Sequence, residues 1–392
     1  MHTEAARSDF SRDVYCLLGM PVDAVDFAGA EQRVRSAAER RSPCFLSTPN
    51  VNFLVTCQSD EAFRDALLDS DLSVVDGMPL VWLGRLVGIP LRERVAGSSL
   101  FEALRHGGGK RLSVFFLGGE EGDGAQAMRQ LEMENLGLAC VGHFAPGYGS
   151  VEDMSGDELI QRINASNADV LVVSLGARKG QVWIDRNRRR LNVPVISALG
   201  AVLHFAAGTV KRAPVWMQNA GLEWLWRIKE QPELWRRYFH DGLHLARLLV
   251  TRVLPQAWYL RRHSATPALL AGARLDISEQ GAVHVIRLRG AWTQANSPRL
   301  RRAFHHAALC GKDVRLDLEE LTHIDSAFVG LAMLLHVHLR RQRRRLLLAG
   351  APKAVRRFID RSGAGFLHSS AAAATQRDGV DEAELSDPVQ PS

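Results

Sequence analysis

The chain has 392 residues, of which 46% are hydrophobic and 23% charged, and its formal net charge is +6. This length predicts two domains, and the composition is typical of a folded globular protein rather than a disordered or fibrous one. The five cysteines lack CxxC or CxxH spacing, so the sequence predicts neither a zinc site nor a disulfide framework. The positive charge favours an anionic partner, which charge alone leaves open among nucleic acid, anionic lipid and a nucleotide diphosphate.

The beginning of the chain argues against export. Met1 to Asp13 contains five charged residues and no apolar core, unlike a secretory signal. No window reaches the roughly 18 uncharged apolar residues that a spanning helix needs. These features predict a cytoplasmic protein that does not cross a bilayer.

Short apolar runs alternate with helical periodicity from about Tyr15 to about Leu254. Val114 to Leu117, Val170 to Leu175 and Pro194 to Ala198 are typical of buried parallel strands in an α/β sheet. A glycine-rich loop, Gly118 to Gly124, leads from the first of them into a helix expected to begin near Ala125. This loop is either a phosphate cradle at a helix N-terminus or an ordinary turn, because the GxGxxG spacing is absent.

The segment from Leu234 to His263 mixes Leu, Trp and Tyr with arginines and contains Pro255. Such a mixture is typical of an interfacial helix on anionic lipid, and the alternative is a helix packed on the domain with solvated arginines. A second strand and helix alternation begins at Val283 to Leu288, followed by Val314 to Leu318 and Leu346 to Leu348, and predicts a small second α/β unit. Beyond Ser369 the tail is expected to be disordered.

Two polar clusters follow apolar runs where α/β sheets bind ligands. The first contains Thr48, Asn50 and Asn52, and the second places Asp76 before Gly77. An aspartate at a strand end can act as a base, or it can cap the next helix. Spacing leaves both roles of Asp76 open.

Seven short motifs follow one another in a recognisable order: T-P-N-x-N, V-D-G-M-P, E-R-V-A-G, F-L-G-G, G-Y, R-A-P-x-W and G-L-E-W-L-x-R. Together they resemble the WecG/TagA/CpsF glycosyltransferases, also called glycosyltransferase family 26, over roughly residues 15 to 240. The resemblance implies a Rossmann-like parallel-sheet domain. It also implies an inverting transferase that moves an N-acetylmannosamine-type or glucose-type sugar from a UDP-sugar to a polyprenyl-diphosphate-linked saccharide.

The same resemblance implies roles for individual residues. Asp76 is the expected general base that removes the acceptor hydroxyl proton, and Arg94 is expected to neutralise the negative charge of the nucleotide diphosphate. No cofactor and no metal are expected, and the family self-associates and touches the membrane through a basic C-terminal appendage. The other substrate-binding residues expected from the motifs are Thr48, Asn50, Gly118, Gly119, Tyr148, Lys179, Gln181, Arg212 and Arg227.

The chain departs from the family pattern at two places. Where the family usually has G-x-P-K-Q-E, this sequence has Arg178 for the proline, Gly180 for the glutamine and Gln181 for the glutamate. Gln181 reaching in from the next position, a different donor, and a weakened enzyme are three open readings. His204 stands where an aspartate is common and is expected to be structural.

Residues 275 to 368 resemble STAS domains, the fold of anti-sigma-factor antagonists. The motif runs from Val314 to Leu318, then through Leu321 to Ser326, and is expected to place the Ser326 hydroxyl at the exposed N-terminus of a helix. In that family the matching serine is phosphorylated, which would add about −1.5 to −2 charge. Capping of the helix by Asp325 and Ser326 is the alternative.

The sequence thus predicts four segments: a glycosyltransferase domain with its basic appendage at 1–240, an amphipathic helix and linker at 241–273, a STAS-like domain at 274–368 and a tail at 369–392. The expected partners are the UDP-sugar, the lipid-linked glycan, the inner face of the cytoplasmic membrane, a protein bound by the STAS-like domain and a second copy of the chain, but no nucleic acid. The alternative is a catalytically weakened scaffold that switches partners through the STAS-like domain. A nucleotide-dependent oxidoreductase is excluded by the missing dinucleotide fingerprint.

Overall fold

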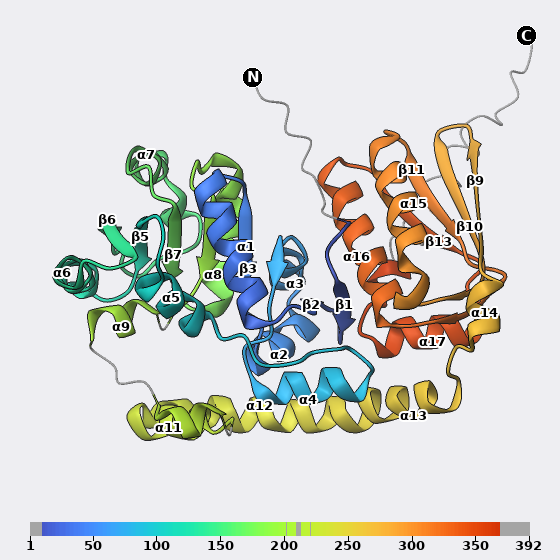
Figure 1. The fold of residues 1–392 in the computed structure, drawn as a ribbon, viewed down its shortest axis with the longest axis horizontal. Helices are drawn as coiled ribbons and strands as arrows, with labels where there is room; N and C mark the ends of the chain where they lie inside the picture. The colour runs from blue at the N-terminus through green and yellow to red at the C-terminus, as the bar shows by residue number, and fades with distance from the viewer. Residues whose placement is uncertain (1–9, 201, 209–212, 220, 369–392) are drawn as a thin grey trace, which may run out of the picture. The chain divides into compact units, whose positions relative to one another are not determined.

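The computed structural model describes residues 10–200, 202–208, 213–219 and 221–368, coloured along the chain in Figure 1. The chain divides into two compact units, Met20–Pro255 and a second that joins Met1–Gly19 to Gln256–Ser392. Residues 10–19 therefore group with the C-terminal unit, whereas the sequence analysis assigned them to the glycosyltransferase domain at 1–240. Arg212 and the predicted tail at 369–392 lie outside the described residues.

The larger unit is built on a parallel sheet of six strands in the order β4-β3-β8-β7-β5-β6. The three apolar runs predicted as strands are β5, β7 and β8, so the predicted parallel α/β sheet is confirmed. The strands are β3 (Cys44–Ser47), β4 (Leu72–Ser73), β5 (Leu112–Gly118), β6 (Leu138–Phe144), β7 (Val170–Ser174) and β8 (Val195–Ala198), and the short β2 (Met20–Asp23) precedes them.

Helices cover both faces of this sheet, because its strands carry apolar side chains on both sides. One apolar cluster joins the sheet to α1, α5, α6 and α9, and a second joins the opposite face to α7 and α8. The helices of the unit are α1 (Phe27–Arg40), α2 (Val51–Ser59), α3 (Glu61–Leu68), α4 (Met78–Leu86), α5 (Gly97–His106), α6 (Asp123–Glu134), α7 (Asp157–Ala165), α8 (Ala177–Asn187), α9 (Val202–Ala207), α10 (Val215–Asn219), α11 (Glu223–Glu230) and α12 (Trp235–Leu248).

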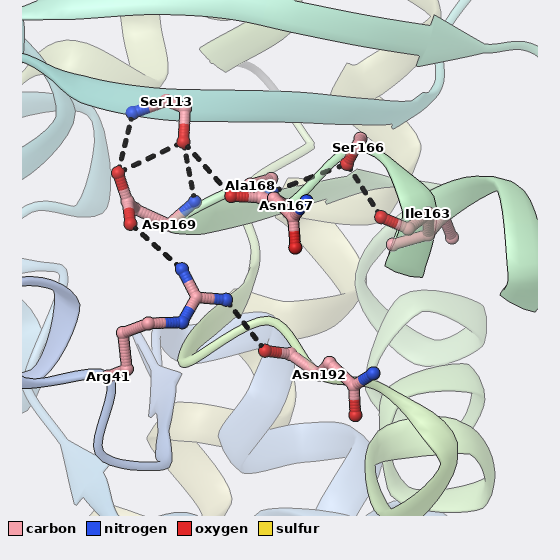
Figure 2. A network of polar contacts seen from close by, with 8 residues as sticks. All are labelled: Arg41, Ser113, Ile163, Ser166, Asn167, Ala168, Asp169 and Asn192. Carbon is pink, nitrogen blue, oxygen red and sulfur yellow. Dashed lines mark hydrogen bonds and ion pairs between the residues drawn. The ribbon is translucent and has the colours of Figure 1, made fainter.

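A buried carboxylate secures the amino-terminal edge of the sheet (Figure 2). Asp169 Oδ2 accepts hydrogen bonds from the backbone N–H and the hydroxyl of Ser113, both at 3.0 Å, and its Oδ1 lies 3.2 Å from Arg41 Nη1. Arg41 also donates to the Asn192 carbonyl at 3.1 Å. The network ties β5, β7 and the segment before β8 together at the edge opposite the carboxyl ends of the strands.

The helix α12 is followed by a π-helical turn at Leu249–Val253, immediately before α13 (Leu254–Arg262). Pro255 has no N–H to donate and its ring clashes with a carbonyl one turn back, so a widened turn before it relieves the clash. Within the described parts of the chain, no helix combines the length and apolar character that crossing a bilayer requires.

The smaller unit has its own sheet in the order β12-β10-β11-β13, with β9 pairing antiparallel to β10. The predicted strands at Val283, Val314 and Leu346 are confirmed as parts of β10, β11 and β13, while β9 was not predicted. The elements are α14 (Pro267–Ala271), β9 (Arg274–Gln280), β10 (Val283–Trp292), α15 (Ser297–Leu309), β11 (Asp313–Asp317), β12 (Leu321–Ile324), α16 (Ser326–Arg341), β13 (Leu346–Ala349) and α17 (Lys353–Arg361).

The N-terminal strand β1 (Val14–Leu17) is part of the smaller unit and lies across α16. Gly330 makes this approach close, because a Cβ there would stand 2.7 Å from the Val14 carbonyl oxygen and 2.9 Å from the Tyr15 Cα. Val14 and Tyr15 are buried, and burial followed by the nearby Asp13 carboxylate raises the pKa of Tyr15 to about 12. Residues 14–19 are therefore buried, whereas Ser11 and Asp13 before them are exposed.

Gly330→Ala tests this packing. The added methyl would meet backbone atoms of β1, so we expect the free energy of unfolding of the smaller unit to fall by about 1 to 3 kcal/mol. The matched control is Gly272→Ala, where the nearest atom would be 3.5 Å away, an ordinary contact. Thermal unfolding followed by circular dichroism measures both, and equal melting temperatures for the two variants would show that β1 does not press on α16.

Candidate functional site

The first part of the candidate site follows β3. Thr48 is 7% exposed, and Asn50 is the N-cap of α2, where its side-chain oxygen accepts the Phe53 N–H at 3.2 Å. Because the Asn50 side-chain oxygen accepts a hydrogen bond from the helix, its NH₂ group is the part suited to a ligand. Both residues lie at the carboxyl end of a parallel strand, where such sheets bind ligands.

Asp76 lies beside this cluster. Its N–H donates to the Pro49 carbonyl at 2.7 Å, while the Val95 N–H donates to the Val75 carbonyl at 2.9 Å. The Gly97 N–H donates to the Asp76 carboxylate. A Cβ on Gly97 would stand 3.1 Å from Thr48 Cγ2, so the chain there comes close to Thr48. The first three sequence motifs therefore meet around Asp76.

Arg94 and α11 complete the cluster. Arg94 Nη1 lies 2.9 Å from Glu223 Oε2, and the two side chains are only 13% and 16% exposed. Arg227, one turn further along α11, acts on Asp76 electrostatically together with Arg94 and Glu223. Two carboxylates and two guanidinium groups thus share one region, which we call the Asp76 cluster. Sequence analysis predicted three of these four residues and missed Glu223, although it stands in the G-L-E-W motif.

Burial dominates the proton affinity of Asp76. Loss of hydration raises the pKa of the Asp76 carboxyl, Arg94 and Arg227 lower it, and the like charge of Glu223 raises it, with a net increase. A carboxylate that holds a proton more tightly than usual is a better base at neutral pH, provided that it is ionised there.

The glycine-rich loop after β5 departs from a simple phosphate cradle. Gly118 and Gly119 have φ angles of +102° and +82°, which glycine adopts readily. The Asp123 carboxylate accepts the Glu120 N–H at 3.0 Å and lies 3.2 Å from His204 Nδ1. The Asp123 carboxylate therefore occupies the Glu120 N–H, one of the loop groups that could otherwise bind a phosphate, and His204 is the ion-pair partner of Asp123.

Three further predicted residues lie at different depths. Tyr148 is fully exposed. Lys179 donates to the carbonyl of Gly149, the residue that follows Tyr148, at 2.8 Å. Gln181 is 0% exposed and donates to the Ser47 hydroxyl at 2.6 Å. The side chain is thus enclosed in the interior, and a contact between Gln181 and a substrate stays a prediction. Gly180 is also enclosed, with a Cβ position 3.2 Å from the Ala198 Cβ.

Asp241 is a buried acid that the sequence did not single out. It is 5% exposed on α12, and Asn52 Nδ2 donates to its carboxylate at 3.3 Å. Burial raises the pKa of Asp241, and the Asn52 hydrogen bond opposes that rise. The second asparagine of T-P-N-x-N thus connects α2 to α12.

In the smaller unit, Asp325 is the N-cap of α16 and its carboxylate accepts the Phe328 N–H at 3.0 Å and the Gln294 N–H at 2.8 Å. Ser326 is only 3% exposed. The prediction of an exposed Ser326 hydroxyl was therefore wrong, because the surrounding chain covers the first turn of this helix. The N-cap of the helix is Asp325.

Across the described ranges, no group of three or more His, Cys, Asp or Glu side chains has the arrangement of a metal site. What the Asp76 cluster can do with its own groups is take up a proton and bind an anion. Those are the two tasks of a base-assisted transfer from a phosphorylated donor.

Asp76→Asn tests the half-buried Asp76 carboxylate through stability. Because the folded-state pKa of Asp76 is raised, ionised Asp76 lowers stability at neutral pH, and the loss disappears as pH falls toward the unfolded value. We expect the variant to melt at a higher temperature than the parent at pH 7, with a gain that narrows in acid.

Asp60→Asn supplies the opposite control. Burial acts to raise the pKa of Asp60, but hydrogen bonds from the Phe63 N–H and Arg178 outweigh it and lower the value. This variant should therefore melt lower at pH 7. A lower melting temperature for Asp76→Asn as well would contradict the raised pKa of Asp76.

Comparison with known proteins agrees with this architecture. Residues 15–258, more than half of the chain, match the model of the "Glycosyl transferase WecG/TagA/CpsF family", and residues 275–369 match "Mlab, STAS domain". An N-acetylglucosaminyldiphosphoundecaprenol N-acetyl-beta-D-mannosaminyltransferase of Bacillus spizizenii is 29% identical over 226 residues, which cover 55% of this chain and 85% of the relative. The enzyme of the same name from Bacillus subtilis is 29% identical over 195 residues, or 49% and 73% of the two chains. The chain is a glycosyltransferase of the WecG/TagA/CpsF family with a STAS domain behind the family region.

Proposed function

We propose that the chain transfers a sugar from a UDP-sugar to a polyprenyl-diphosphate-linked saccharide, with inversion, in the synthesis of a cell-surface polysaccharide. The observation that carries the proposal is the meeting of Thr48, Asp76 and Arg94, from three separate motifs, at the carboxyl edge of the sheet. The names of the two Bacillus relatives describe transfer of N-acetylmannosamine to a lipid-linked N-acetylglucosamine. An N-acetylmannosamine-type or glucose-type donor is therefore the class to test first.

In the proposed reaction Asp76 is the general base that takes the proton of the acceptor hydroxyl. The acceptor hydroxyl attacks the anomeric carbon of the donor sugar, its O–H proton passes to an Asp76 carboxylate oxygen, and a new glycosidic C–O bond forms. The bond from the anomeric carbon to the diphosphate oxygen breaks, and UDP leaves with the electron pair. Attack on the face opposite the leaving group inverts the anomeric centre.

The charged and polar groups around Asp76 divide the remaining tasks. Arg94 and Arg227 supply permanent positive charge for the diphosphate, and guanidinium donors match phosphate oxygens in geometry. Thr48 and the Asn50 amide are proposed to hold the acceptor beside Asp76, and Gly118, Gly119, Tyr148 and Lys179 to border the donor. No cofactor is required in this scheme, and Arg212 remains a proposed phosphate ligand from its motif alone.

Exposed apolar side chains on α4, α11, α12 and the helical segment after α12 suit the lipid-linked acceptor. We call this set of side chains the apolar face, and its members are between 39% and 69% exposed: Trp82, Leu86, Trp224, Leu225, Trp235, Phe239, Leu243, Val250 and Leu254. Trp235, Phe239 and Leu243 recur every four residues and share one side of α12. Figure 1 shows α4 running beside this helix, and α4 contacts the π-helical turn that follows it.

Basic side chains accompany the apolar face. The guanidinium groups of Arg236 and Arg237 lie 5.7 Å and 5.1 Å from the Trp235 and Tyr238 ring centres, and the Lys229 amine lies 5.0 Å from the Trp226 ring centre. Aromatic residues mixed with cations are typical of segments that lie at the surface of anionic lipid. We therefore propose peripheral association with the inner face of the cytoplasmic membrane, and a regulatory or partner-binding role for the STAS domain.

The direct test of the activity is sugar transfer from a panel of UDP-sugars to a synthetic polyprenyl-diphosphate glycan. Asp76→Ala should lower kcat about 10²- to 10⁴-fold, the usual contribution of a placed base. Because only ionised Asp76 accepts a proton, the parent rate should also fall as pH drops through its raised pKa. The control is Asp157→Ala, whose side chain is 86% exposed. Folded parent protein that transfers no sugar from any donor would favour the scaffold alternative.

The apolar face is tested by sedimentation with vesicles that contain anionic lipid. The double variant Phe239→Ser and Leu243→Ser should bind at least tenfold more weakly, because each buried apolar side chain contributes about 1.5 to 3 kcal/mol. The control is Met133→Ser on α6, a residue 74% exposed outside this face. Equal binding by the double variant and the control would remove the apolar face from the proposal.

A further inference from the structure

Arg94 has a carboxylate partner within the protein. Its guanidinium lies 2.9 Å from Glu223 Oε2, and neither side chain is more than 16% exposed. Glu223 is the first residue of α11, 129 positions further along the chain than Arg94. A pair with so little solvent exposure is weakly screened, so the charge of Glu223 has a large influence on its neighbours.

Asp76 is the neighbour that this charge affects. Among the residues that the structure describes, the charged groups with the largest effect on Asp76 are Arg94 from the loop before α5 and Glu223 and Arg227 from α11, while the Gly97 N–H donates to its carboxylate. The Val95 N–H donates to the Val75 carbonyl at 2.9 Å, so Arg94 lies next to the segment that carries Asp76. Without Glu223, the positive charges of Arg94 and Arg227 would act on Asp76 without the opposing charge of that carboxylate. Nearby positive charge stabilises an aspartate anion and weakens it as a base.

We propose that Glu223 is a positioning residue of the transfer site: by holding and neutralising the Arg94 guanidinium, its carboxylate leaves Asp76 a strong enough base to accept the acceptor's proton. Glu223 touches neither the sugar nor the proton in this scheme and acts through Arg94 and Asp76. The inference rests on the proposed function for its catalytic meaning. The effect of Glu223 on the proton affinity of Asp76 needs no substrate and can be tested on the protein alone.

A simpler role for the ion pair would be to fasten α11 to the body of the unit. Another ion pair of similar burial separates the two roles. Arg188 Nη2 lies 3.0 Å from Asp69 Oδ2, with side chains 13% and 8% exposed, and Asp69 precedes β4 at the amino-terminal end of the sheet. Asp69→Asn therefore removes a comparable ion pair without altering the charge near Asp76.

The kinetic test compares pH profiles of kcat/KM for the parent, Glu223→Gln, Glu223→Asp and Asp69→Asn. Glu223→Gln should move the acidic limb about half a unit to one unit to lower pH and reduce kcat at neutral pH about 3- to 10-fold, because the base becomes weaker. Glu223→Asp keeps the charge and should restore the limb toward that of the parent. Asp69→Asn should leave the limb in place, and UDP binding should persist in all four proteins.

If the acidic limb of the Glu223→Gln profile stays in place and activity falls by the same factor at every pH, the inference is overturned, and the ion pair only attaches α11 to the body of the unit.

A second measurement needs no activity. The gain in melting temperature from Asp76→Asn at pH 7 should be smaller in the Glu223→Gln background, because the like charge that opposes ionised Asp76 has gone. An equal gain in melting temperature in both backgrounds would overturn the inference even if the parent transfers no sugar. If the parent transfers no sugar but the gain is smaller in the Glu223→Gln background, only the proposed reaction is refuted.

Discussion

Arg94 carries a permanent positive charge at a position where little water reaches it, and the arrangement around it follows from the need to balance that charge. Glu223 lies in direct contact with it, and Asp76 lies in the same cluster. A buried guanidinium without a counter-charge would cost several kcal/mol. The two carboxylates come from distant parts of the chain, so balancing Arg94 also requires α11 to be folded onto the sheet domain.

The sheet and its order of motifs could be predicted because each depends on local sequence. Val170 to Leu175 is a continuous apolar run, which is what a strand covered on both faces requires. Asp76 and Thr48 could be predicted as neighbours because the carboxyl ends of parallel strands meet at one edge. The STAS strands were found for the same local reason, whereas β9 was missed because most of its residues are exposed and polar.

What the sequence could not predict depends on contacts between distant residues. The partner of Arg94 lies 129 residues away, and no spacing rule connects the two. Asp123 appeared only as part of a glycine-rich loop, yet its carboxylate binds the loop N–H group that a phosphate would otherwise use. Ser326 was expected at the surface because its own helix start predicts exposure. Its burial depends on how the rest of the smaller unit packs, which includes a strand from the beginning of the chain.

Polar contacts also decide where the appendage helices stand on the larger unit. Apolar packing alone is tolerant of small shifts along a helix, whereas a buried hydrogen bond or ion pair holds only in one register. Asn52 donates to the buried Asp241 of α12, and Glu223 binds Arg94 at the start of α11. Burial raises the pKa of Asp241, so we expect its ionised form to lower stability at neutral pH. Because Asn52 belongs to the motif that carries Thr48 and Asn50, one short segment both borders the site and fixes the helix that presents the apolar face, so the geometry of the site and the placement of that face are set together.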